Sequence, residues 1–106
     1  VCNYANLAAS MGEPRKAIKA LKRCANAVKK HNLENSSDYA NLVWDIGCIY
    51  MQMRDKDNAV MYFKTALRIY TDLWTNEPEL LQMKLIELKN MVAVYGVNIK
   101  NLISAN

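Results

Sequence analysis

One histidine and three cysteines are the side chains of this sequence best suited to catalysis or metal binding. His31, Cys2, Cys24 and Cys48 form no Cys-x-x-Cys pair and no Cys/His spacing, so they do not predict a zinc site or a redox pair. An odd number of cysteines without a recognisable spacing is typical of reduced thiols, which favours a cytoplasmic protein. His31 falls at an expected helix end, where a cation complements the helix dipole.

No other group of residues predicts a reaction. The chain has no glycine-rich phosphate loop and no nucleophile motif. Asp55, Asp57 and Asn58 suggest the start of a calcium loop, but the glycine and the bidentate glutamate of such a loop are missing. We therefore expect a protein that is not an enzyme, with no catalytic residue, no metal and no cofactor.

The basic residues are concentrated in one stretch of the chain. Net charge is +4 over 106 residues, and half of the 14 Lys and Arg fall on one expected helix. They are Arg15, Lys16, Lys19, Lys22, Arg23, Lys29 and Lys30. A solvated outer face is the expected role, and a surface for acids or nucleic acid is the alternative. No aromatic residue interleaves with these cations, which argues against direct nucleic-acid contact.

An internal period of about 42 residues organises the chain, and a period of about 20–50 residues predicts a solenoid. Ala17 pairs with Ala59 at this interval, and Gly12 and Gly96 lie two periods apart on either side of Arg54. In a solenoid each unit buries its apolar face against its neighbours. No apolar run approaches the roughly 18 residues that a bilayer-spanning helix needs, so we expect no membrane partner.

Apolar residues at helical spacing predict the elements that carry this period. The expected helices cover 1–11, Pro14 to near His31, then begin at Ser36 or Ser37, at Asp55 or Asp57, at Asn76, and near Asn98. Ser, Asp and Asn are placed at these starts because their side chains cap helix N-termini, and Asn76 with Glu79 predicts a capping box. Gly96 ends the fifth helix.

The middle unit carries a specific pattern of bulky and small residues. It reads Val43, Ile46, Gly47 and Tyr50 on its first helix, then Ala59, Phe63 and Ala66 on its second. Gly47 and Ala59 are small enough for the two helices to approach closely. At these spacings the unit resembles the tetratricopeptide repeat family.

The resemblance implies an all-α fold, an α-α superhelix of antiparallel helix pairs. The repeats would cover about 1–35, 36–76 and 77–106, the last one truncated, in a single segment (1–106) of a longer protein. The common repeat has about 34 residues, and the period here, at about 42 residues, is longer. It is therefore similar to the longer variety in kinesin light chains and in bacterial regulators that bind signalling peptides.

The resemblance also implies a concave groove lined by the first helix of each repeat. The residues expected to face it are Asn3, Asn6, Asn41, Trp44, Asp45, Cys48, Gln52, Glu87 and Asn90. Asn and Gln side chains can pair with an extended peptide backbone because each has a donor and an acceptor side. Trp44 would add an exposed apolar anchor. The alternatives are that Trp44 belongs to the core and that the Asn side chains are only solvated.

These residues predict a scaffold module that binds a protein or an extended peptide. Asp45 and Glu87 favour a neutral or basic peptide and argue against a clamp for a terminal carboxylate. The alternative function is the peptide-sensing part of a bacterial transcription regulator. Self-association through the apolar end near Leu102 and Ile103 is a further alternative.

Overall fold

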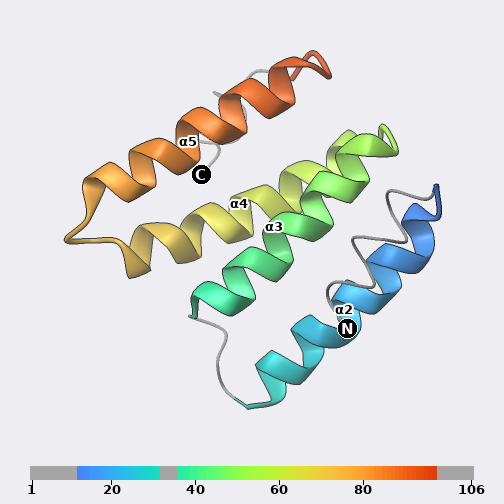
Figure 1. The fold of residues 1–106 in the computed structure, drawn as a ribbon, viewed down its shortest axis with the longest axis horizontal. Helices are drawn as coiled ribbons and strands as arrows, with labels where there is room; N and C mark the ends of the chain where they lie inside the picture. Colours follow the sequence, from blue (N-terminus) through green and yellow to red (C-terminus); the bar gives the residue numbers. More distant parts are fainter. Residues whose placement is uncertain (1–11, 32–35, 98–106) are drawn as a thin grey trace.

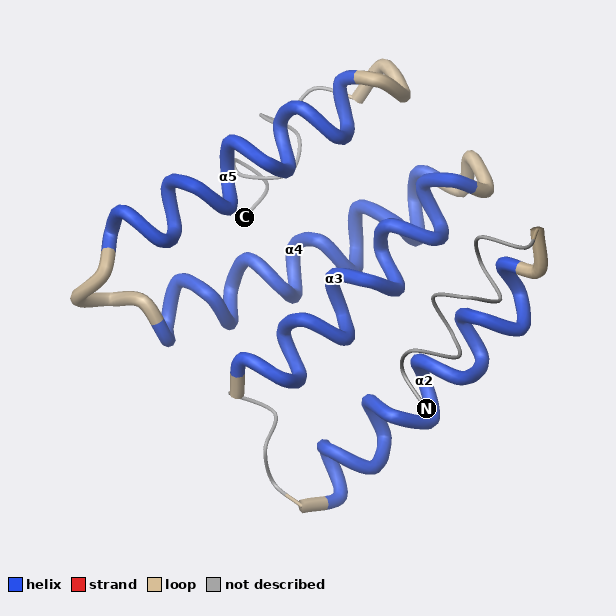
Figure 2. The backbone as a smooth tube through the Cα atoms, viewed as in Figure 1, coloured by secondary structure: helices blue, strands red, loops and turns tan. Residues whose placement is uncertain are grey.

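The computed structural model describes residues 12–31 and 36–97, which form an array of antiparallel helices (Figure 1). The helices are α2 (Pro14–Lys30), α3 (Ser37–Gln52), α4 (Lys56–Leu73) and α5 (Pro78–Ala93). In Figure 2 these ranges contain helices and connections and no strand, as the sequence predicts. The α3–α4 pair packs closely and lies in the middle of the array, with α2 beside α3 on one flank and α5 on the other.

The starts of α3 and α4 are fixed by side-chain caps. Ser36 Oγ accepts a hydrogen bond from the Tyr39 backbone N–H at 3.2 Å, and Asp55 Oδ1 accepts one from the Asn58 N–H at 3.3 Å. Each cap satisfies one of the backbone donors that a helix N-terminus leaves unpaired. Of the predicted alternatives, Ser36 and Asp55 are therefore the caps.

The start of α5 differs from its prediction. Glu77 is the N-cap residue, and no side chain makes a cap hydrogen bond there. The prediction of a capping box between Asn76 and Glu79 was wrong. Pro78 in the first turn supplies a preset φ instead, and the Glu77 N–H bonds back to the Trp74 carbonyl at 3.0 Å.

The three residues that the repeat register aligns share one backbone conformation. Gly12 has φ +85°, Arg54 φ +65° and Gly96 φ +74°. Left-handed residues at helix ends let the chain reverse, and glycine adopts this conformation without steric cost. A left-handed residue therefore recurs before α2, between α3 and α4, and after α5.

The core consists of two clusters on opposite sides of the middle pair. One joins α2 to α3 through residues such as Leu21 and Ile46. The other joins α3, α4 and α5 through residues that include Phe63, Tyr70 and Leu88. The two clusters share no buried residue, although Tyr39, Tyr50 and Tyr62 pack against both. Among the described residues, each flanking helix is therefore held by the middle pair.

Close approach within the middle pair depends on Gly47. A Cβ atom at this position would lie 3.0 Å from Cε1 of the Phe63 ring. This confirms that a small residue is needed there. The helix predicted over 1–11 and the one predicted from Asn98 lie outside the described residues.

Candidate functional site

Two lines of side chains face each other across the space between α3 and α5. The α3 line is Asn41, Asp45 and Cys48, and the α5 line is Lys84, Glu87 and Met91. Positions three and four apart on a helix lie on one side of it, so each line runs along its helix. These six residues are called the α3–α5 polar face below.

Direct contacts join this face across the helices. Cys48 Sγ lies 3.5 Å from Met91 Sδ. The Tyr70 hydroxyl, which belongs to α4, donates a hydrogen bond to Asn41 Oδ1. The structure therefore brings α3, α4 and α5 together at a single surface.

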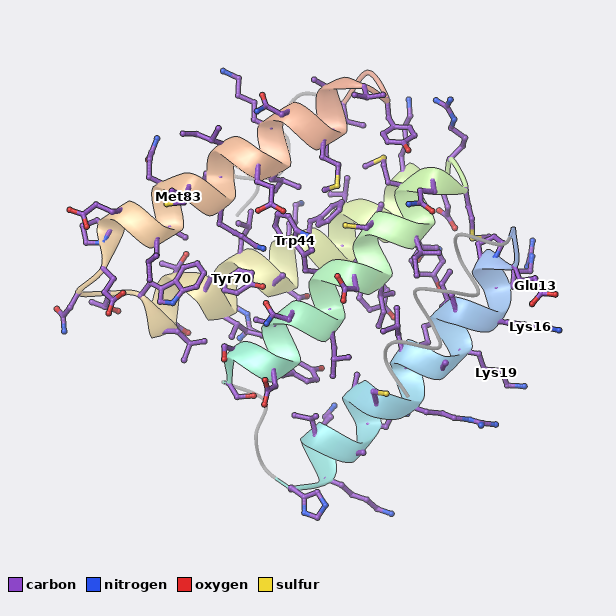
Figure 3. All side chains as sticks on the ribbon, viewed as in Figure 1. Glu13, Lys16, Lys19, Trp44, Tyr70 and Met83 are labelled. Atoms are coloured by element: carbon purple, nitrogen blue, oxygen red, sulfur yellow. The ribbon has the colours of Figure 1, made fainter. Side chains whose placement is uncertain are left out.

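Trp44 lies beneath this surface and is 5% exposed. The prediction of an exposed anchor was wrong, and the core alternative holds. Figure 3 shows Trp44 and Tyr70 between the middle pair and α5. The Lys84 ammonium covers the Trp44 ring, 4.2 Å from its centroid, and the Phe63 ring packs edge-on at 5.2 Å. Trp44 is buried between the rings of α4 and the Lys84 side chain of α5.

Burial and charge shift three titrating groups on or next to this face. Burial raises the pKa of Asp45 above its ordinary value, although the nearby Lys84 opposes the shift. Burial, followed by the charges of Asp45 and Glu87, raises the pKa of the Cys48 thiol to about 12. The same causes raise the pKa of Tyr70 to about 12. At neutral pH the Cys48 thiol is protonated, which makes it a poor nucleophile.

Two surface pockets flank the α3–α5 polar face. The pocket between α2 and α3 has a volume of about 370 Å³ and is lined by Cys24, Val28, Asp38, Asn41, Leu42 and Asp45. The pocket beside α5 has about 500 Å³ and is lined by Trp74, Leu80, Met83, Lys84, Ile86 and Glu87. The polar face and the pockets share Asn41 and Asp45 on one side and Lys84 and Glu87 on the other, so the three form one continuous surface.

The other predicted groove residues fall outside this cluster. Gln52 and Asn90 are exposed on α3 and α5, and no described contact joins them to it. Asn3 and Asn6 lie outside the described residues. Lys84 was not predicted from the sequence. Its position three residues before Glu87 places both side chains on the same side of the helix, and their charged groups lie 3.5 Å apart.

The basic side chains of α2 are all exposed. Lys16 and Lys19 point away from the other helices in Figure 3, and Lys16 pairs with Glu13 at 3.5 Å. Lys22 instead donates a hydrogen bond to the Tyr50 hydroxyl at 3.0 Å. His31 is the C-cap residue of α2, in agreement with its predicted place.

The described ranges hold neither a metal site nor a membrane span. Within 12–31 and 36–97, no group of three His, Cys, Asp or Glu side chains is placed to hold a metal ion. Among the four described helices, none combines the length and apolarity that crossing a bilayer requires.

The fold and this surface define a helical repeat protein built from antiparallel pairs. Residues 40–72 match the family model for the tetratricopeptide repeat. The match covers most of α3 and α4, the pair that carries the Gly47–Phe63 contact, and it supports a tetratricopeptide repeat family for the chain. Neither the curated proteins nor the solved structures gave a match.

Proposed function

We propose that this chain is a protein-interaction module that binds an extended peptide across the α3–α5 polar face. The repeat match suggests a protein-interaction scaffold in general. That the partner is an extended peptide, and that it binds at this face, goes beyond the match. Both points rest on the family's use of the first helix of each repeat to line a groove, and these helices would here be α3 and α5.

One observation carries this proposal above the others. Cys48 Sγ of α3 lies 3.5 Å from Met91 Sδ of α5. The Lys84 ammonium of α5 lies 4.2 Å from the Trp44 ring centroid of α3 and pairs with Glu87. The two helices that would line the groove therefore meet at one surface that carries polar and charged side chains.

The chemistry of the face favours a neutral or basic peptide. Asp45 and Glu87 outnumber the single cation Lys84, and Asp38 lines the adjoining pocket. Tyr70 occupies an acceptor position on Asn41, so the amide N–H groups of Asn41 are left for a peptide carbonyl.

The spacing of the helices supports the longer variety of repeat. Pro14 and Lys56, the starts of α2 and α4, are separated by the same interval as Ala17 and Ala59. Nearly the same interval separates Ser37 from Pro78, the starts of α3 and α5. The repeat boundaries, a cytoplasmic location and self-association stay predictions. So does the alternative of a peptide-sensing regulator, which no described residue tests.

A peptide display selection against the chain tests the proposal. Selected peptides should bind Asp45→Asn/Glu87→Gln at least about tenfold more weakly than the wild type, because each change removes a charge from the face. Asp72→Asn, at an exposed acid on α4, is the matched control and should bind normally. Equal affinity for all three chains would place the peptides elsewhere and refute the site.

A further inference from the structure

The Lys84 ammonium lies in a site built for a cation. It is 4.2 Å from the Trp44 ring centroid and 5.3 Å from that of Tyr70, and 3.5 Å from Glu87 Oε2. Lys84 is also close enough to Asp45 for its positive charge to lower the pKa of that carboxyl group. Two aromatic faces with carboxylates beside them are the features that recognise an ammonium group.

The aromatic side of this site is rigidly held. The Trp44 ring packs edge-on against Phe63 at 5.2 Å and against Tyr70 at 6.2 Å. Tyr70 in turn stacks on Trp74 at 4.6 Å. The ring faces are therefore fixed by the core and do not depend on Lys84 for their position.

The Lys84 side chain is positioned so that it can turn out of this site. Its side chain is 20% exposed and lines the pocket of about 500 Å³ beside α5. Asp45 and Glu87 together carry two negative charges when ionised, and Lys84 supplies one positive charge. If Lys84 turns into the pocket, a second ammonium can enter over the rings and neutralise the remaining charge.

We propose that Trp44, Tyr70, Asp45 and Glu87 form a subsite for a lysine side chain of the partner. Lys84 is an internal ligand that occupies this subsite until the partner's lysine displaces it. The inference rests on the proposed function, since the lysine belongs to the peptide bound there. Because the partner's lysine can enter only when Lys84 is out, the apparent affinity equals the intrinsic affinity multiplied by the fraction of time that the subsite is empty.

A second lysine in the chain supplies a matched control. Lys22 lies over the rings of Tyr50 and Tyr62, at 5.5 and 5.9 Å from their centroids. It is bonded to the Tyr50 hydroxyl, and only tyrosines act on its pKa as neighbours. Lys22→Ala therefore also removes a cation from two aromatic rings, but no carboxylate contact is described at this position.

The first experiment titrates the full chain with n-butylammonium, the isolated end of a lysine side chain. The Trp44 indole N–H signal is followed by NMR. In Lys84→Ala it should shift saturably, at least about tenfold more tightly than in the wild type or in Lys22→Ala. The isosteric n-butanol should have no such effect. An equal response to both compounds, or no response in Lys84→Ala, overturns the subsite.

A measurement on the wild type covers the case in which Lys84→Ala does not fold. The Lys84 ε-methylene group is bonded to the ammonium that lies 4.2 Å from the Trp44 ring centroid, so we expect the ring current of Trp44 to shift its NMR signal. Excess n-butylammonium should return this signal toward its solvent position. If it does not move under concentrations that leave the fold intact, displacement is refuted.

The second experiment uses a lysine-bearing peptide from the display selection and its norleucine analogue. The ratio of the affinity for the lysine peptide to the affinity for the norleucine peptide should be about tenfold larger in Lys84→Ala than in the wild type. Lys89→Ala, which changes an exposed lysine on the same helix, should leave this ratio unchanged. If peptide binding depends on Asp45 and Glu87 but does not change when norleucine replaces lysine, the subsite is refuted and the proposed function stands. If no peptide binds while n-butylammonium still titrates Trp44, the proposed function fails and the ammonium site is retained.

Discussion

Gly47 shows how a single missing side chain sets the distance between two helices. Alanine is the better helix former by about 1 kcal/mol, so propensity alone predicts that Gly47→Ala stabilises the chain. The added Cβ would lie 3.0 Å from the Phe63 ring, and overpacking typically costs about 1–3 kcal/mol. We expect a net loss of about 1 kcal/mol in urea denaturation. With Phe63→Leu in place, the same change should become stabilising. A loss of equal size in both backgrounds would contradict the ring as its cause.

Some residues of the site follow from the sequence and others do not. Helical spacing and the repeat predict Asn41, Asp45 and Glu87 on a shared face. In the structure Asn41 and Asp45 line the pocket on one side of that face and Glu87 lines the pocket on the other. The prediction for Trp44 was wrong because its spacing was judged against the stripe of α3 alone. Trp44 is buried by the Phe63 and Tyr70 rings of α4 and by Lys84 of α5, which all lie far along the chain from it. The Lys84 contact could not be predicted, because a long side chain's direction depends on that same packing.

At the scale of the element, the turns preserve the period better than the helices do. The sequence aligns Gly12, Arg54 and Gly96, and all three have positive φ. A solenoid needs the same change of direction in every unit, so backbone conformation is repeated even where the side chain is not. Helix starts follow local chemistry instead, and α5 begins without the capping box that its sequence indicated.

Arg54 is the one described non-glycine residue with positive φ, at 65°. This conformation costs roughly 1 kcal/mol for a residue with a Cβ, while the Arg54 guanidinium lies 4.9 Å from the Tyr95 ring centroid. Exposed contacts of this kind contribute about 0.5–1 kcal/mol. We therefore expect Arg54→Gly to be nearly neutral in the wild type and to stabilise a Tyr95→Leu chain by about 1 kcal/mol, measured by chemical denaturation. Destabilisation in both backgrounds would show that the turn is not strained.

At the scale of the whole molecule, we expect the flanking helices to unfold independently, because the two core clusters share no buried residue and have only the partly buried Tyr39, Tyr50 and Tyr62 in common. Leu88 is fully buried where α5 meets the middle pair, whereas Met83 on the same helix is 66% exposed. Leu88→Ala should cost about 2–5 kcal/mol in the α5 contact, and Met83→Ala should stay within about 0.5 kcal/mol. Stability in a solenoid is a sum of units and neighbouring interfaces. Hydrogen exchange should therefore accelerate at the α5 amides in Leu88→Ala while the α2 amides keep their protection. Equal loss of protection in α2 and α5 would mean that the two clusters act as one cooperative core, although they share no buried residue.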